Sequence, residues 1–188
     1  KDKKKDKFKN LKALNIKEFE NQLKILKKNF NVLAPAEIKY IITNKLKFSN
    51  KDFWLTFDDG YLDHYNNVFP LLEKYKFKGS FFPSVNILKQ KELMDVNIIQ
   101  LVFSKKINID DIFNEIDNLA ANENLKLENY LKKIPNNHRF DNLKTNQIKQ
   151  LLQYILPKQI RIKLINILKR KYIKTKKKNL HKKFYMNL

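Results

Sequence analysis

The sequence predicts an α/β protein with an additional all-helical part, and three observations support this. Residues 53–57 (Phe-Trp-Leu-Thr-Phe) form an apolar run without alternation, which is typical of a strand buried on both faces of a parallel sheet. A similar run at 80–83 follows within about thirty residues, the length of a strand–helix–strand unit. Between 96 and 175 the apolar residues recur at helical spacing, and no strand is predicted there.

The composition indicates a globular protein of 188 residues, 43% of them hydrophobic. This length suits one domain with a core, or a domain with a large insertion. Because the chain has no cysteine, it contains neither disulfides nor a thiolate metal site. Neither a signal peptide nor a membrane-spanning apolar stretch is visible, which leaves the location open between the cytoplasm and the cell surface.

The net charge of +21 comes almost wholly from lysine. Arginine, the usual residue for reading phosphates and bases, occurs only at 139, 161 and 170. Lys, Asn and Ile are all frequent and all have A/T-rich codons, so codon bias explains the charge. We expect weak, salt-sensitive binding to polyanions and no specific nucleic-acid partner.

The segment before the first buried run predicts a Lys-rich lead over 1–16, then two helices separated by a short break at 31–33, which is either a loop or a brief strand. Pro35 suits the first turn of the second helix. The expected buried residues are Phe19, Leu23, Leu26 and Phe30 in the first helix, and Ile38, Ile41 and Ile42 in the second.

After Gly60 a helix is expected over 61–75, and Pro70 should kink or split it because proline lacks an N–H. Its expected buried face comprises Tyr65, Val68, Phe69, Leu72 and Tyr75. The strands at 53–58 and 80–84 should then lie side by side and parallel, joined by this helix.

Five helices are expected in the second half of the chain. Their apolar positions fall within 96–103, 109–120, 125–134, 148–155 and 160–172. Asp110 and Asp111 suit the first turn of the second helix, and Pro157 should end the fourth. The charge run 174–178 resembles a hinge, and 180–188 begins a further element.

Asp58, Asp59 and Gly60 follow the buried run at the carboxyl end of its strand, where α/β folds bind ligands. In a tight turn the two carboxylates can face different ways, so one can act as a base and the other as a metal ligand. The alternative is structural: Asp59-Gly60 is a plain turn and Asp58 a helix cap.

Several short segments resemble one family. They are Thr56-Phe57-Asp58-Asp59-Gly60, Asp59-Gly60-Tyr61, Tyr65-Asn66, Phe69-Pro70-Leu71-Leu72, Lys74-Tyr75 and Gly79-Ser80-Phe81-Phe82. They resemble the first motif, second helix and third strand of the NodB-homology polysaccharide deacetylases, carbohydrate esterase family 4. The stretch from Phe19 to Leu33 resembles the family's leading helix and loop, so the resemblance covers residues 17–86.

The resemblance implies the N-terminal part of a distorted (β/α) barrel, incomplete in this chain and carrying a large helical insertion. The implied divisions are 1–86 for the α/β part, 87–176 for the insertion and 177–188 for the return to the barrel. Tyr185 and Met186 are where the chain would return towards the family's histidine pair.

The resemblance also implies a hydrolase that removes acetyl groups from the amino sugars of a surface or cell-wall polysaccharide. Asp58 would be the general base and Asp59 a ligand of a divalent metal, usually zinc. Gly60 and Tyr61 would contact the substrate, an acetylated polysaccharide or amino-sugar oligomer. Neither the sugar nor the choice between N- and O-acetyl groups is indicated.

The sequence departs from the family in its histidines. The family's His-x-x-x-His pair is missing, since the histidines here are His64, His138 and His181. His64 is the candidate substitute ligand, although an exposed helix position is the simpler interpretation. Zinc sites need about three protein ligands, so we expect this chain alone to bind zinc weakly and to be inactive. Two alternatives remain open: a non-catalytic, basic, helical binding module for a polyanion or protein, and a nucleic-acid binder acting by charge alone.

Overall fold

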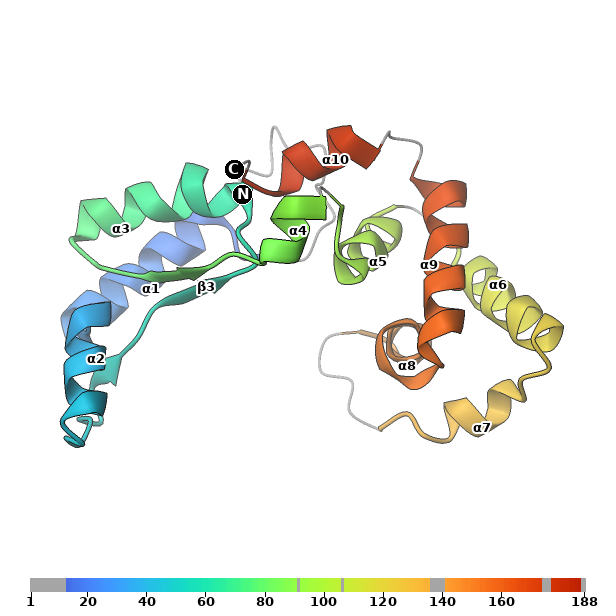
Figure 1. The fold of residues 1–188 in the computed structure, drawn as a ribbon, viewed down its shortest axis with the longest axis horizontal. Helices are drawn as coiled ribbons and strands as arrows, with labels where there is room; N and C mark the ends of the chain where they lie inside the picture. Colours follow the sequence, from blue (N-terminus) through green and yellow to red (C-terminus); the bar gives the residue numbers. More distant parts are fainter. Residues whose placement is uncertain (1–12, 91, 106, 136–140, 174–176, 187–188) are drawn as a thin grey trace. The chain divides into compact units, whose positions relative to one another are not determined.

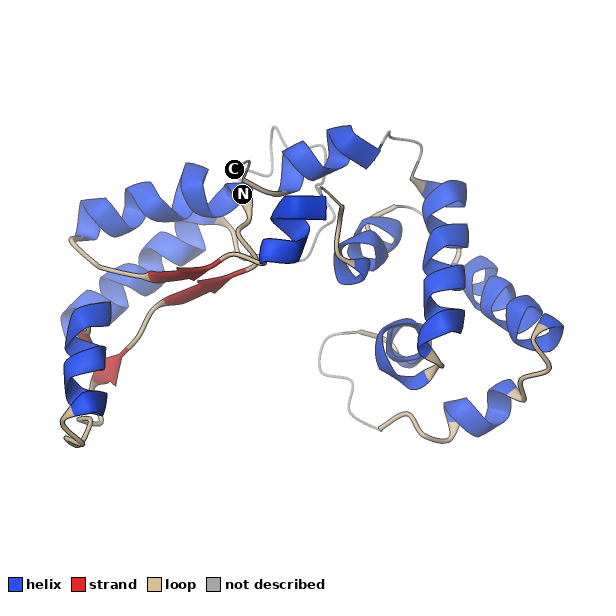
Figure 2. Cartoon of the chain, viewed as in Figure 1, coloured by secondary structure: helices blue, strands red, loops and turns tan. Residues whose placement is uncertain are grey.

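The computed structural model describes residues 13–90, 92–105, 107–135, 141–173 and 177–186 (Figure 1). These residues form two compact units. The first comprises the described residues of Lys12–Leu93 and Lys176–Leu188, and the second those of Met94–Thr175. All strands of the described chain, drawn in red in Figure 2, belong to the first unit, so it is the α/β unit and the second is the helical unit.

The α/β unit starts with a helix whose first turn is set by the sequence. Asn15 accepts a hydrogen bond from the Glu18 N–H, and Glu18 accepts one from the Asn15 N–H, which satisfies two backbone donors at the helix start. The elements are α1 (Ile16–Asn29), β1 (Asn31–Val32), α2 (Pro35–Thr43), β2 (Asp52–Phe53), β3 (Thr56–Asp58), a π-helical turn (His64–Val68), α3 (Phe69–Tyr75), β4 (Ser80–Phe82), α4 (Val85–Gln90) and α10 (Lys177–Phe184).

The strands form two parallel pairs. Strand β1 pairs with β2, which confirms a brief strand in the break after α1. Strand β3 pairs with β4, with Thr56 opposite Ser80 and Asp58 opposite Phe82. This confirms the predicted parallel strand–helix–strand arrangement, because α3 lies between β3 and β4 in the chain. No closed barrel is formed by the strands of the described residues.

The prediction that 53–57 is one strand buried on both faces is wrong. Residues 54 and 55 separate β2 from β3, and Phe53 and Trp54 are 42% and 45% exposed. One face is covered, since the Phe57 ring meets Phe19 of α1 edge-on at 6.2 Å. On the other face Trp54 meets the half-exposed ring of Phe82, with centroids 6.2 Å apart, and its indole N–H donates to the Ser80 hydroxyl at 2.9 Å, yet its side chain stays exposed. A continuous apolar run needs layers on both faces, and the described residues supply one.

Two helical faces also differ from expectation. In α2 only Ile38 is buried, whereas Ile42 is exposed, because no described element packs extensively against this helix. Pro70 splits the helix over 61–75, as predicted. Without the proline N–H a regular turn is lost, and the Phe69 N–H donates to the His64 carbonyl five residues back. The wider turn changes the phase of the helix, so Tyr65 is exposed while Leu72 is buried.

The helical unit contains no strand among its described residues, as predicted. Its elements are α5 (Asp95–Phe103), α6 (Ile109–Asn122), α7 (Leu127–Leu131), α8 (Leu143–Gln150), a π-helical turn (Leu151–Ile155) and α9 (Lys158–Tyr172). Asp110 and Asp111 lie in the first turn of α6, as expected. The helix expected over 125–134 is shorter: α7 begins at Leu127, and after Lys132 the N–H groups of Lys133 and Ile134 bond only three residues back, in tight turns. Leu156 is extended, as the residue before a proline prefers, and this ends the helix before Pro157.

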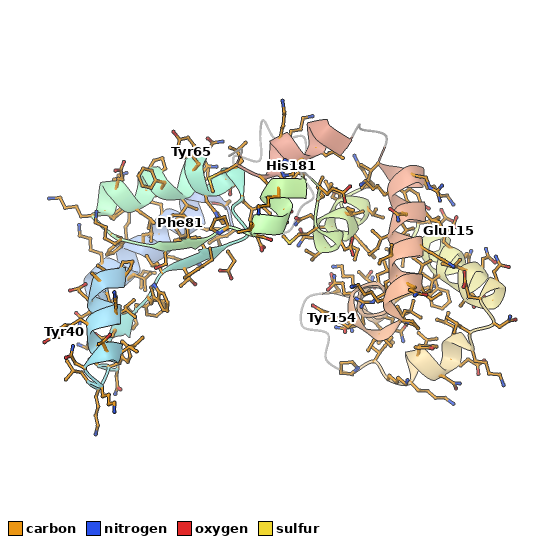
Figure 3. All side chains as sticks on the ribbon, viewed as in Figure 1. Tyr40, Tyr65, Phe81, Glu115, Tyr154 and His181 are labelled. Atoms are coloured by element: carbon orange, nitrogen blue, oxygen red, sulfur yellow. The ribbon has the colours of Figure 1, made fainter. Side chains whose placement is uncertain are left out.

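Helix α9 packs against both α5 and α6. Leu164 and Leu168 of α9 are almost fully buried, and Ile112 and Ile116 of α6 have no exposed surface. The outer edge of the α6–α9 pair carries ion pairs, Lys163 with Glu123 and Lys171 with Glu115; Glu115 is labelled in Figure 3. In the described part of the chain, no helix is both long and apolar enough to cross a bilayer.

Several expectations concern residues outside the described ranges. Most of the Lys-rich lead lies there, since the description begins at residue 13 and α1 at Ile16. Residues 174–176 of the charge run also lie outside it, and α10 begins at Lys177. The further element expected over 180–188 is therefore part of α10, which ends at Phe184, followed by Tyr185 and Met186.

Candidate functional site

The turn after β3 has an unusual backbone. Asp59 and Gly60 have φ angles of 71° and 67°, both in the left-handed region. At Gly60 a Cβ would lie 2.9 Å from the Cβ of Pro83, so glycine is needed both for the angle and for the space. Asp59 bears the cost of a non-glycine residue at positive φ, a strain that is concentrated at functional sites.

Two segments hold this turn from opposite sides. The Asp59 N–H donates to the Phe82 carbonyl of β4 at 2.9 Å. The Gly60 carbonyl accepts from the Met186 N–H at 3.1 Å. Tyr61 and Tyr185 form an antiparallel bridge, and their rings stack with centroids 5.3 Å apart. The turn is therefore fixed by β4 on one side and by the residues after α10 on the other.

The two carboxylates have different surroundings. Asp58 ends β3 opposite Phe82 and is exposed, on the same face as Thr56 by strand alternation. Asp59 is half-buried in the turn. An exposed carboxylate at a strand end can take a proton from a water molecule, which is what a general base must do.

His64 is half-buried rather than on an exposed helix position. Its ring lies among three aromatic rings, with centroid distances of 5.6 Å to Phe57, 5.5 Å to Tyr61 and 6.0 Å to Phe81. Phe81 is labelled in Figure 3. Its Nδ1 is buried and has no hydrogen-bond partner among the described residues. Burial lowers the pKa of His64, and the nearby carboxylates of Asp63, Asp59 and Asp58 oppose this only in part.

The other histidines lie elsewhere. His181, labelled in Figure 3, is buried in α10, and its Nε2 lies 3.1 Å from the Ile87 carbonyl. That carbonyl can only accept, so Nε2 carries the proton of this bond. His138 falls outside the described residues. The burial of His181 was not predicted from its basic surroundings; the apolar spacing of Leu180, Phe184 and Tyr185 was the available signal.

The described donors do not fit a zinc centre. Zinc in proteins takes three or four ligands, and the described residues contain no group of three His, Cys, Asp or Glu side chains that could hold a metal ion. The structure brings the expected residues Asp58, Asp59, Gly60 and Tyr61 into one turn, with His64 beside Tyr61. It also brings Tyr185 and Met186, which were expected only as the place where the chain returns, into contact with this turn.

Comparison with known proteins gives two similarities. Residues 45–109 match the family model described as "Polysaccharide deacetylase". A protein of Bacillus subtilis (strain 168) named "Putative polysaccharide deacetylase YxkH" is 42% identical over 67 residues, which is 35% of this chain and 24% of that protein. The chain thus spans about a quarter of the length of the curated relative that it matches. No solved structure matches the chain.

Proposed function

The N-terminal part of this chain resembles the polysaccharide deacetylases, and from this premise we propose that it provides part of the active site of such an enzyme. The reaction would be hydrolysis of acetyl groups on the amino sugars of a surface or cell-wall polysaccharide. The observation that supports this most strongly is the strained Asp58-Asp59-Gly60 turn, which lies within the matched residues at the end of a parallel strand.

In this proposal Asp58 is the general base. Its carboxylate takes a proton from water while the water oxygen bonds to the acetyl carbonyl carbon. The bond from that carbon to the sugar nitrogen or oxygen then breaks, and Asp58 returns the proton to the leaving atom. The products are acetate and the free amino or hydroxyl group. The exposure of Asp58 supports the role, because water and a polymer can both reach it.

The proposal gives Asp59 the role of one ligand of a divalent metal, with zinc as the expected ion. A bound metal of this kind would polarise the acetyl carbonyl. Since the described donors are too few, the remaining ligands would have to come from other residues, and the burial of His64 in an aromatic cluster does not favour it as one of them. Gly60 and Tyr61 are proposed to contact the substrate.

The proposed organisation keeps the divisions expected from the sequence. Residues 1–86 would be the first part of a distorted (β/α) barrel, 87–176 a helical insertion, and 177–188 the return to the barrel. The pairing of Tyr185 with Tyr61 supports the last division, because it brings the end of the described chain back to the turn after β3.

The test measures acetate release from N-acetylglucosamine oligomers by the chain alone and by the chain joined to the C-terminal part of the Bacillus relative. Zinc binding is measured by calorimetry on both proteins. We expect weak zinc binding and no acetate release from the chain alone, and activity from the joined protein. Asp58→Asn should abolish that activity while sparing zinc binding, and Asp59→Asn should weaken zinc binding.

Two results would contradict the proposal. Activity that survives Asp58→Asn in the joined protein would exclude Asp58 as the base. Stoichiometric, sub-micromolar zinc binding with acetate release by the chain alone would show that the ligand count is wrong.

A further inference from the structure

We propose that the residues after α10, Tyr185 and Met186, position the Asp58–Gly60 turn for its chemistry, Met186 through its backbone and Tyr185 through Tyr61. This deepens the proposed function and rests on it, since it assigns these two residues to the same site. They come from a part of the chain more than a hundred residues after the turn, and they contact it through the backbone as well as through a side chain.

The backbone contact is the first argument. A turn with two successive positive φ angles is not the preferred conformation of an isolated chain, so the surrounding structure must hold it. Asp59 is held by its N–H bond to Phe82, and Gly60 by the bond from the Met186 N–H to its carbonyl. Without the second bond, the Gly60 backbone would lose its direct tie to the segment after α10.

The side chain of Tyr185 is the second argument. Tyr185 is fully buried, and its ring stacks on Tyr61 at an interplanar angle of 16°. The centroid of the Tyr185 ring also lies 5.2 Å from that of His181 and 6.3 Å from that of Phe184. Tyr61 follows Gly60 directly, so fixing its ring restrains the exit of the turn.

The third argument is the attachment of α10 itself. The Tyr185 N–H donates to the His181 carbonyl at 2.9 Å, which joins Tyr185 to the last turn of the helix. The buried His181 ring in turn bonds to the Ile87 carbonyl of α4. Helix α4 follows β4 closely in the chain. The bond from Asp59 to β4 and the bond from α10 to α4 therefore attach the turn to one short segment, residues 80–90.

The decisive substitution is Met186→Pro, which removes the N–H donor, and Met186→Leu is the matched control that keeps it. Amide hydrogen exchange is measured by NMR on the full 188-residue chain. We expect the Asp59 amide to exchange at least about tenfold faster in Met186→Pro and less than about twofold faster in Met186→Leu. The Phe77 amide, bonded to Leu72, and the Ser104 amide, bonded to Gln100, should not change.

Tyr185→Leu and Tyr185→Phe form a second pair, which decides the matter if Met186→Pro fails to fold. Leucine removes the ring stack, so we expect faster exchange at Asp59, and phenylalanine should restore the slow rate because it keeps the ring. Equal acceleration at Asp59, Phe77 and Ser104 in these variants would overturn the proposal, because it would indicate general destabilisation. An unchanged Asp59 rate would overturn it as well.

The exchange measurement does not depend on catalysis. An inactive protein with the expected exchange pattern would leave the positioning role in place and count against the proposed reaction. Acetate release combined with an unchanged exchange rate at Asp59 would support the proposed reaction and refute the positioning role.

Discussion

The two units of this protein bury their apolar side chains to very different extents. In the helical unit the large exposed apolar residues are Leu143, Tyr154 and Ile162. In the α/β unit they are Leu14, Ile25, Phe30, Tyr40, Ile42, Leu46, Phe48, Phe53, Trp54, Tyr65, Phe69, Phe82 and Val85. The apolar residues of the helical unit are mainly Ile and Leu, whereas the α/β unit holds Trp54 and most of the described phenylalanines.

The difference follows from how helices and sheets use their backbone. A helix satisfies its hydrogen bonds internally, so a few helices can complete a core by packing their apolar faces together, as α5, α6 and α9 do. A parallel sheet is normally covered by layers on both faces. The pairs β1–β2 and β3–β4 have one partner per strand, and a two-stranded sheet is only marginally stable by itself. The helical unit is therefore the more self-sufficient of the two.

The largest expected effect tests that self-sufficiency. Leu164→Ala should lower the free energy of unfolding of the helical unit by about 3 kcal/mol, because Leu164 has no exposed surface and its loss leaves a cavity. Ile162→Ala, at a 43% exposed position of the same helix, is the control and should cost far less. Urea unfolding followed by circular dichroism measures the change.

The single tryptophan, Trp54, reports on the α/β unit separately. If the units unfold independently, Leu164→Ala shifts the circular dichroism transition and leaves the fluorescence transition of Trp54 in place. A joint shift of both transitions would break the comparison, because it would show that the α/β unit depends on the helical one.

The next effect concerns the turn of the candidate site. Gly60→Ala should destabilise the α/β unit by about 2 kcal/mol, because alanine disfavours the positive φ and its Cβ would contact Pro83. Lys76→Gly makes the opposite exchange at a φ of 60° and should stabilise the same unit by up to about 1 kcal/mol. Trp54 fluorescence in urea measures both. Equal stability of Gly60→Ala and the parent protein would refute the steric argument.

A smaller effect depends on pH through His64. Burial lowers its folded-state pKa below the ordinary value of 6.5, so its neutral form stabilises the folded α/β unit. This contribution is fully present above pH 6.5 and is lost as the pH falls through the folded-state pKa. Between pH 7.5 and 5.5 the urea midpoint of Trp54 fluorescence should therefore fall, and fall less in His64→Gln. An NMR midpoint for His64 at or above 6.5 would contradict this.

The smallest expected effect lies on the surface of the helical unit. The Lys163–Glu123 ion pair is largely solvent-exposed, so a double-mutant cycle with alanine at both positions should give a coupling of about 0.5 kcal/mol or less. The coupling should disappear in high salt, because mobile ions screen exposed charges. A larger, salt-resistant coupling would mean that charge pairs, as well as apolar burial, distinguish the two units.

Local sequence patterns predicted the helical unit well. The apolar spacing in α6 and α9, the acidic first turn of α6 and the stop before Pro157 all depend on residues within a few positions of one another. The parallel pairing of β3 with β4 was also predictable, because the connection between them is short. Within the candidate site, the Asp58-Asp59-Gly60 turn was visible from its residues alone.

What the sequence by itself determined, then, is most of the helices, the parallel pairing of β3 with β4 and the identity of the turn, since these follow from short-range periodicity and from glycine's freedom at positive φ. Only the tertiary structure decided which faces are buried, because burial of Phe53, Trp54 and Ile42 depends on layers supplied by other parts of the chain. It alone placed His64 in an aromatic cluster and brought Met186 to Gly60. Contacts between residues so far apart in the chain leave no periodic pattern in the sequence, because they are set by packing in three dimensions.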